Sequence, residues 1–273
     1  MHRASLLFWI FLLPVLPACE EVIHVDLNQA APRLVIEGIV TDAGDRAVVY
    51  LSQTRSFTEE TGFTGVSGAN IYISENQSEP VLLTETAPGV YQSPTPMGAP
   101  GNTYSLRVET QSEIYTATSA MPLKIPADSL YFRKEVFPGQ SYILPYIAFR
   151  DPGGQTDYYR FRLLVNGTFL RRVDVYDDEY TDGLAVQEGL FYLGDEDNAD
   201  PADDDGLLPG DEVTVEMQCI DYGVYRYFFT LRQTLEQSAV SPANPESNIS
   251  GGALGYFNAC TTQQITRTVP NLP

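Results

Sequence analysis

Residues 33–53 read RLVIEGIVTDAGDRAVVYLSQ, and this stretch decides the fold class. Arg33–Val40 and Ala47–Gln53 are rich in β-branched and aromatic side chains, which favour strands. Thr41–Asp45 lies between them and contains Thr, Asp and Gly, a composition typical of a turn. The stretch therefore predicts a β-hairpin.

Further short strands follow along the chain, separated by turns rich in Gly, Pro and Asn. Asn166-Gly167 is the strongest hairpin signal among these turns. We expect strands at 69–74, 81–84, 103–109, 114–120, 129–136, 142–150, 157–165, 169–175 and 212–220, and at least one last strand within 253–269 that includes 264–269. Many short strands at regular spacing predict an all-β protein made of β-sandwiches.

The strand pattern is interrupted at residues 121–127, MPLKIPA, which contain two prolines. We place a domain boundary there, because domain boundaries fall in segments of this composition. The prediction is two β-sandwich domains in tandem, an N-terminal one at 33–121 and a C-terminal β-rich domain at 127–273. The length of the chain is compatible with two ordinary domains.

One helix is predicted near the C-terminus, at 224–238, where VYRYFFTLRQTLEQS contains neither Gly nor Pro. Four apolar side chains fall at helical spacing on one face: Val224, Phe228, Leu231 and Leu235. Asp221 stands just before this run, in the place of an N-cap residue. We expect the helix to pack across a sheet.

The N-terminal segment has the features of a lipoprotein signal peptide at 1–18. An apolar run follows Arg3 and is shorter than the roughly 20 residues of a membrane span. Leu16-Pro17-Ala18-Cys19 closes this run in a lipobox arrangement, so that Cys19 becomes the lipidated N-terminus. The alternative is an ordinary cleaved signal that happens to precede a Cys.

Residues 19–32, CEEVIHVDLNQAAP, form the expected tether between the lipid and the first strand. Acidic residues directly after a lipidated Cys resemble the signals that send lipoproteins to the outer cell surface. We therefore expect a protein held in the outer membrane by acylated Cys19 and facing the cell surface. The periplasmic face is the alternative.

Charge and composition exclude several classes of function. The formal net charge is -20, which makes nucleic acid and anionic lipid headgroups poor partners, and no nucleic-acid partner is expected. Both histidines, His2 and His24, precede the predicted domains. This excludes a Ser-His-Asp or Cys-His hydrolase site and a His-ligated zinc site from those domains. We assign no catalytic residues and expect no enzyme. Paired carboxylates acting on glycans are the remaining enzymatic alternative.

An acidic run without Lys or Arg occupies residues 173–212, and its centre, 195–205, reads DEDNADPADDD. Calcium prefers carboxylate and carbonyl oxygens on flexible loops. The candidate ligands are Asp195, Asp197, Asp200, Asp203 and Asp205. Their spacing does not fit the EF-hand pattern, and a solvated acidic loop is the interpretation that we favour over a calcium site. Calcium is the only cofactor that the sequence suggests.

Cys219 and Cys260 are the two cysteines that remain beside Cys19. A secreted protein can oxidise such a pair, so one prediction is a Cys219–Cys260 disulfide. The other is two buried, unlinked thiols. Neither cysteine has a second Cys or a His nearby in sequence, so their spacing indicates no metal site.

Several segments in this order and spacing resemble one family. They are CEEVIHVDL at 19–27, LVIEG at 34–38, SGA at 67–69, GVY at 89–91, YTAT at 115–118 and NISGGALGYF at 248–257. The family is domain-of-unknown-function family 4249, a group of Bacteroidota outer-membrane lipoproteins. The first half also resembles the small Ig-like sandwich modules related to carboxypeptidase regulatory domains.

The resemblance implies a role and a partner, but it supplies no catalytic residues. Members of the family are often encoded beside TonB-dependent outer-membrane receptors. This implies a lipid-anchored accessory or ligand-binding protein that works with a TonB-dependent transporter in nutrient uptake. A structural or adhesive surface lipoprotein without a transport partner is the alternative.

The glycine-rich run within 248–257 has two interpretations. Gly251 and Gly252 permit positive φ angles or a close backbone approach, and Tyr256 and Phe257 follow as aromatic anchors. One interpretation is a structural corner that locks the last strand. The other is a partner-docking loop made of these four residues.

Overall fold

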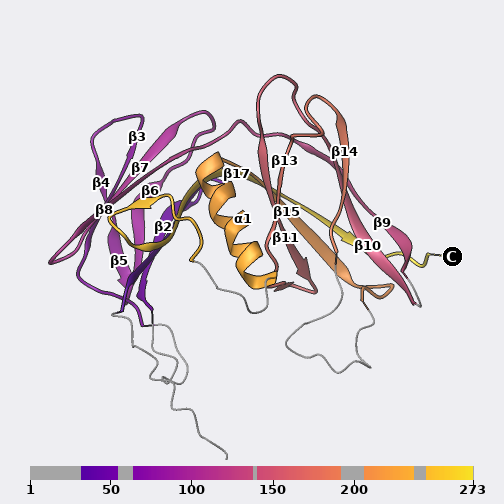
Figure 1. Ribbon diagram of the computed structural model, residues 1–273, viewed down its shortest axis with the longest axis horizontal. Helices are drawn as coiled ribbons and strands as arrows, with labels where there is room; N and C mark the ends of the chain where they lie inside the picture. The colour runs from indigo at the N-terminus through magenta and orange to yellow at the C-terminus, as the bar shows by residue number, and fades with distance from the viewer. Residues whose placement is uncertain (1–31, 55–63, 138–139, 192–205, 237–243, 273) are drawn as a thin grey trace, which may run out of the picture. The chain divides into compact units, whose positions relative to one another are not determined.

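Strands make up most of this protein, whose computed structural model describes residues 32–54, 64–137, 140–191, 206–236 and 244–272 (Figure 1). The strands of the first half are β1 (Leu34–Thr41), β2 (Arg46–Gln53), β3 (Asn70–Glu75), β4 (Val81–Leu82), β5 (Thr84–Ala87), β6 (Val90–Pro96), β7 (Thr103–Glu109) and β8 (Ile114–Ala120). The predicted β1–β2 hairpin is confirmed, with Gly38 opposite Val49.

The second half adds longer strands and the helix. They are β9 (Ala127–Phe137), β10 (Gln140–Arg150), β11 (Tyr158–Val165), β12 (Thr168–Phe169), β13 (Asp174–Asp177), β14 (Ala185–Gly189), β15 (Glu212–Ile220), α1 (Tyr222–Glu236), β16 (Ile249–Ser250) and β17 (Leu254–Thr268). Asn166 and Gly167 form the β11–β12 turn with φ angles of 49° and 81°. The prediction of an all-β protein with one helix near the C-terminus is confirmed.

Three sheets are present in the described part of the chain. A nine-stranded sheet runs β12-β11-β15-β17-β1-β2-β6-β5, with β13 also pairing with β11. A five-stranded sheet has the order β16-β8-β7-β3-β4, and a three-stranded sheet has the order β14-β10-β9. The five-stranded sheet shares one hydrophobic core with β1, β2 and β6, and the three-stranded sheet shares a second core with β11 and β15. The layout is therefore sandwich-like in both halves.

The longest strand of the protein, β17, joins the two halves. Its first part pairs in parallel with β1, from Leu254 opposite Val35 to Cys260 opposite Thr41. Its second part pairs antiparallel with β15, from Thr261 opposite Cys219 onwards. The last strand expected within 253–269 is a single continuous strand, which begins directly after the glycine corner.

The segment 121–127, predicted as a domain boundary, contributes residues to both cores. Met121 is buried in the first core and Ile125 in the second. The first core also takes Ile249 and Phe257 from the end of the chain, so residues 33–121 alone do not complete it. The division into two domains stays a prediction, while residues 32–273 form one compact unit.

Alternation along the strands separates the two faces of the nine-stranded sheet. In β17, Phe257 faces the first core, whereas Tyr256 and Cys260 belong to a third cluster with the helix. In β15, Cys219 faces the second core and Ile220 faces the helix. Because neighbouring residues of a strand point to opposite faces, α1 covers the face that the two partner sheets leave free.

The helix begins at Tyr222, two residues before the predicted start, because Asp221 caps it. The backbone N–H of Val224 donates to Asp221 Oδ1 at 2.9 Å. Asp221 Oδ2 also accepts from Ser119 Oγ at 2.7 Å and from the N–H of Ala120 at 2.9 Å. The cap thus ties α1 to the end of β8. Leu235, predicted on the buried face, is 66% exposed.

Candidate functional site

A polar cavity of about 590 Å³ opens on the helix-covered face of the nine-stranded sheet. Its walls come from β1, β11, β15 and β17 and from the turn after β1. The lining residues are Ile39, Thr41, Ala43, Asp45, Arg160, Arg162, Glu216, Gln218, Tyr256, Asn258, Thr262, Gln263 and Gln264. We refer to it as the Arg160 cavity. It draws on both halves of the chain, which only the pairing of β17 with β1 and β15 brings together.

Arg160 reaches the cavity because β11 alternates. Tyr159 and Phe161 turn into the second core, where each is 1% exposed, so Arg160 points to the opposite face. There its Cζ lies 3.8 Å from the centre of the Phe228 ring, and its Nη1 donates to Gln218 Oε1 at 3.4 Å. Burial lowers the pKa of Arg160. Arginine nevertheless remains charged, so the cavity wall carries a poorly solvated cation with donors to offer.

Glu216 organises the polar side chains around this arginine. Its Oε1 accepts from Gln218 Nε2 at 2.5 Å and lies 3.3 Å from Arg162 Nη1. Its Oε2 accepts from Gln264 Nε2 at 3.2 Å. These bonds hold three side chains from three strands in fixed orientations. A preordered polar wall of this kind loses little entropy when a ligand binds.

A second acid, Glu37 on β1, lies on the same face. Burial raises the pKa of Glu37, and the charge of Arg160 opposes that rise. Burial also raises the pKa of Tyr227 to about 12, with Glu37 adding to the effect. Both the cation and the acid are thus partly desolvated beside each other. Their interaction is stronger here than it would be in water.

Among the cavity-lining residues of β17, two side-chain oxygens have no hydrogen-bond partner within the described residues. They are Asn258 Oδ1 and Thr262 Oγ1, both buried and both on residues that line the cavity. Asn258 is 1% exposed. Buried polar groups are nearly always hydrogen-bonded, so unmatched ones indicate a missing partner such as water or a ligand. The cavity therefore offers cationic donors on β11 and free acceptors on β17.

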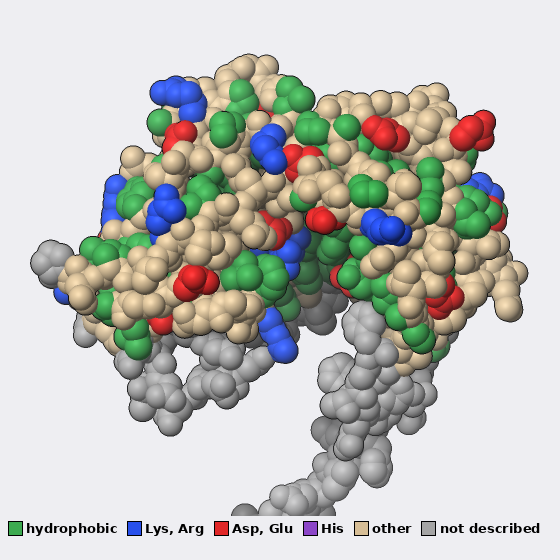
Figure 2. All heavy atoms as spheres, turned by 180° about the vertical axis from the view of Figure 1, so that it is seen from behind, with side chains coloured by type: hydrophobic (Ala, Val, Ile, Leu, Met, Phe, Trp, Pro, Cys, Tyr) green, Lys and Arg blue, Asp and Glu red, His purple; other side chains and the backbone are tan. Residues whose placement is uncertain are grey.

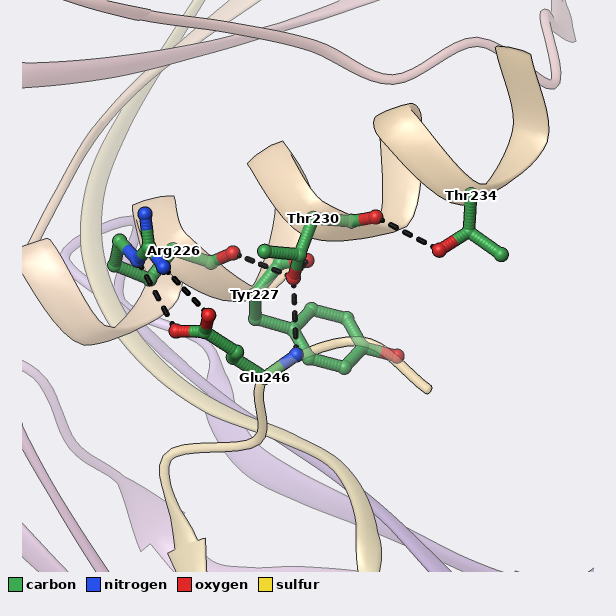
Figure 3. A network of polar contacts seen from close by, with 5 residues as sticks. All are labelled: Arg226, Tyr227, Thr230, Thr234 and Glu246. Atoms are coloured by element: carbon green, nitrogen blue, oxygen red, sulfur yellow. Dashed lines mark hydrogen bonds and ion pairs between the residues drawn. The ribbon is translucent and has the colours of Figure 1, made fainter. Parts of the chain in front are cut away.

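The helix that packs against Arg160 through Phe228 is itself held by the network in Figure 3. Arg226 donates to both carboxylate oxygens of Glu246, at 3.1 and 2.5 Å, and the N–H of Glu246 donates to Thr230 Oγ1 at 2.9 Å. Tyr227 lies between these residues on the helix, and its ring packs at a tilt against that of Tyr256, 5.0 Å between ring centres. The network joins α1 to the segment that leads into β16.

The glycine corner lies at a second cavity, of about 500 Å³. Gly251 and Gly252 line it together with Arg33, whose Nη2 donates to the carbonyl of Gly252 at 2.6 Å. Gly251 and Gly252 have φ angles of 101° and 85°, as a structural corner requires. Tyr256 and Phe257 are 8% and 0% exposed. Of the four predicted docking residues, only the two glycines are accessible.

The predicted cysteine pair consists of two buried free thiols. Cys219 stands opposite Thr261 on β17, so their side chains share the face of the second core. Cys260 is the next residue along β17 and points to the helix side. A disulfide would have to pass through the sheet, so the structure contains the unlinked alternative. Burial raises the pKa of Cys260 to about 12.

Two sets of predicted site residues lie outside the described residues. They are the lipidation site Cys19 and the candidate calcium ligands Asp195, Asp197, Asp200, Asp203 and Asp205. Both assignments stay predictions. No helix in the described part of the chain is long and apolar enough to cross a membrane.

Sequence reasoning missed the Arg160 cavity. The available signal was the alternation of 157–165, DYYRFRLLV, which places Arg160 and Arg162 on one face of a strand whose other face is apolar. Two arginines in a strand interior are notable in a chain with 16 cations and 36 acids. What the strand alone does not reveal is that β17 and the helix enclose that face.

Comparison with known proteins identifies the family. No curated protein matches this chain. The sequence model described as "Domain of unknown function (DUF4249)" matches residues 20–266, which is nearly the whole chain after the predicted signal. The family resemblance drawn from the sequence is thereby confirmed. The chain belongs to the DUF4249 family.

Proposed function

We propose that this protein captures a small polar ligand at the outer membrane and works with a TonB-dependent transporter in nutrient uptake. The observation that carries the proposal is the Arg160 cavity. It combines a desolvated cation with unmatched acceptors on Asn258 and Thr262, in a volume typical of small-molecule sites. A ligand with a carboxylate or carbonyl oxygen for Arg160 and a donor group for β17 would satisfy both.

The anchor is the second part of the proposal. Acylated Cys19 would hold the protein in the outer membrane, facing the cell surface. A net charge of -20 would otherwise keep it away from anionic headgroups. A tether of the predicted 19–32 length would place the cavity near a receptor in the same membrane. Membership of DUF4249 is compatible with this proposal but does not by itself name a partner.

No enzymatic role is part of this proposal. The Arg160 cavity combines acids with arginines and amides, and its buried acid Glu216 is engaged in hydrogen bonds with Gln218 and Gln264. This arrangement favours binding over general acid–base chemistry, which needs a carboxyl group free to exchange a proton.

The transporter partnership is tested by co-purification from the native outer membrane. The full chain with a C-terminal affinity tag is extracted in mild detergent, and its partners are identified by mass spectrometry. We expect a TonB-dependent receptor to co-purify in stoichiometric amount. Cys19→Ala serves as the matched control and should lose both the membrane fraction and the receptor.

The opposite result would favour the alternatives. If the tagged protein is membrane-bound but no such receptor co-purifies, the structural or adhesive role gains support. If Cys19→Ala remains in the membrane fraction, the lipid anchor is contradicted. Release of sugar from surface glycans by the purified protein would support the hydrolase alternative.

A further inference from the structure

Two acidic loops meet at the far end of the second half, away from the predicted calcium loop in sequence. The first, residues 151–157, follows β10 and reads DPGGQTD; the second, residues 177–184, begins at the end of β13 and reads DDEYTDGL. Carboxylate oxygens of Asp151, Asp178 and Asp182 all lie within 4.8 Å of one another. We refer to these three residues as the two-loop cluster.

Backbone hydrogen bonds hold the loops together. The N–H of Gly183 donates to Asp151 Oδ2 at 3.1 Å, and the N–H of Gly154 donates to Asp182 Oδ1 at 2.7 Å. The loops also approach closely at Gly153, where an added Cβ would lie 3.3 Å from the Cα of Gly183. The carboxylates of Asp151 and Asp182 therefore have positions that hydrogen bonds between the two loops determine.

The two innermost carboxylates are buried. Asp151 is 1% exposed and Asp178 is 3% exposed, while Asp182 lies at the surface. Tyr159 donates its hydroxyl to Asp151 Oδ1. Asp157, at the end of the first loop, is also buried and accepts from Gln155 Nε2 at 3.0 Å. Three aspartates of these two loops, Asp151, Asp157 and Asp178, are thus largely removed from water.

The decisive atom is Asp178 Oδ2. It is buried and has no hydrogen-bond partner among the residues that the structure describes. Burial raises the pKa of Asp178, and the charges of Asp151 and Asp182 raise it further. The pKa of Asp157 is raised by burial and by the same three aspartates. A desolvated carboxylate with one unmatched oxygen among other acids is costly unless a positive charge lies beside it.

Protein cations do not supply that charge in the part of the chain that is described. None of the ion pairs recorded there involves a two-loop residue or Asp157. The neighbouring Arg150 directs Nη1 to the carbonyl of Gly183, at 3.4 Å, and not to a carboxylate. An external cation is therefore the simplest partner for Asp178.

We propose that the two-loop cluster binds a calcium ion. Calcium takes oxygen ligands from carboxylates on loops, and several of its usual six to eight positions can be filled by water. Asp178 Oδ2 and one oxygen each from Asp151 and Asp182 would contact the ion, and exposed Asp182 leaves a side open for water. The site uses none of the residues at 195–205 and does not depend on the proposed transport role.

Calorimetry and thermal unfolding of the full, detergent-solubilised protein test this site. The protein is stripped with chelator and titrated with CaCl₂ up to the millimolar range expected of extracellular sites. We expect saturable binding and a calcium-dependent rise in Tm. Asp178→Asn should lose both, while its Tm in chelator should equal or exceed that of the unsubstituted protein, because a buried unpaired charge is removed.

Two further variants make the test specific. Asp182→Asn changes an exposed side chain, should fold normally and should bind calcium about tenfold more weakly. The double variant Asp203→Asn, Asp205→Asn should bind as tightly as the unsubstituted protein. Calcium binding that survives in Asp178→Asn and Asp182→Asn, or that is lost in the double variant, would overturn the proposal. So would the absence of any calcium response, or an equal response to MgCl₂.

Discussion

Single residues explain why the end of the chain turns where it does. Gly255 has a φ angle of 95°, and a Cβ there would lie 2.0 Å from the carbonyl oxygen of Ile36 on β1. The parallel pairing of β1 with β17 therefore requires glycine at this position. Gly252, with a φ of 85°, has no atom within 4 Å of a built Cβ. Comparing substitutions at these two glycines therefore distinguishes the cost of a positive φ alone from the cost of a positive φ with a steric clash.

Gly255→Ala should destabilise the protein by about 3 kcal/mol or more, since it adds a backbone clash to the strain of a positive φ. Gly252→Ala should cost only about 1 kcal/mol, because strain acts alone there. Urea unfolding followed by intrinsic fluorescence measures both. Equal losses in the two variants would show that close packing against β1 is not what requires Gly255.

At the scale of residues, some features could be predicted from the sequence and others could not. The run 248–257 indicated positive φ angles, and the structure has them. The same run did not indicate that Asn248 would bond the backbone of Phe257 through both side-chain atoms, at 2.8 and 2.9 Å. Nor did any spacing connect Asp151 with Asp178, because two loops far apart in the chain meet only after β10, β11 and β13 have formed.

At the scale of elements, α1 depends on one capping side chain. Asp221 accepts from Val224 inside the helix and from Ser119 and Ala120 on the end of β8. It therefore stabilises the helix terminus and holds it against the first sandwich. Through Phe228 and Tyr227, α1 contacts Arg160 and Tyr256, which line the Arg160 cavity, so the cap also helps to hold the helix against these two residues.

Asp221→Ala should destabilise the protein by about 2 kcal/mol, because it removes a cap and leaves buried donors without an acceptor. Arg226→Ala is the matched control. It breaks an ion pair with Glu246 whose side chains are 34% and 58% exposed, and it should cost less than about 1 kcal/mol. Chemical denaturation measures both. A larger loss in Arg226→Ala would contradict the importance assigned to the cap.

Elements were predicted well from sequence where local patterns determine them. The strands 103–109, 114–120 and 212–220 have the bounds that alternation predicted, since one face of each is apolar. The helix was placed by its lack of Gly and Pro. The order of strands in the sheets was not predictable in this way, because the parallel contact of β1 with β17 joins residues over 200 positions apart.

The whole molecule is acidic, and its buried acids give it an unusual response to pH. Burial is the main cause of the raised pKa values of Glu37, Asp157, Asp178 and Glu188. An acid with a raised pKa in the folded state binds its proton more tightly there than in the unfolded chain. Its ionisation therefore costs stability above that pKa, and the cost disappears as the pH falls through it.

In chelator, the urea midpoint should therefore rise as the pH is lowered from neutral towards the ordinary pKa of a carboxyl group, 4.5 for Glu, contrary to the usual acid destabilisation. Asp178→Asn should show a smaller rise, because one of the titrating groups is gone. Denaturation curves at several pH values check this. A midpoint that falls steadily over the same range would mean that acids with lowered pKa values, such as Glu85, dominate.

Acidic and basic side chains are interspersed on the face seen in Figure 2, which is the view from behind Figure 1. This mixture contrasts with the Arg160 cavity, where Arg160 and Arg162 lie together with two acids and several amides. The concentration of desolvated charge in one cavity, and not the net charge of the molecule, is what favours a ligand there.

The central claim is that the Arg160 cavity is a ligand site, and a ligand screen tests it most directly. Thermal unfolding is measured with a panel of amino acids, dipeptides, uronic acids and neutral sugars, because a ligand that binds the folded state raises Tm, and a tighter ligand raises it more at equal concentration. Arg160→Lys keeps the charge but loses the planar fork of donors. Arg107→Lys, at a half-exposed side chain of β7, is the matched control.

We expect at least one carboxylate-bearing compound to raise the Tm of the unsubstituted protein and of Arg107→Lys. The same compound should bind Arg160→Lys about tenfold more weakly or not at all. A Tm response that is equal in all three proteins, or that is lost only in Arg107→Lys, would contradict the assignment of the cavity as the binding site.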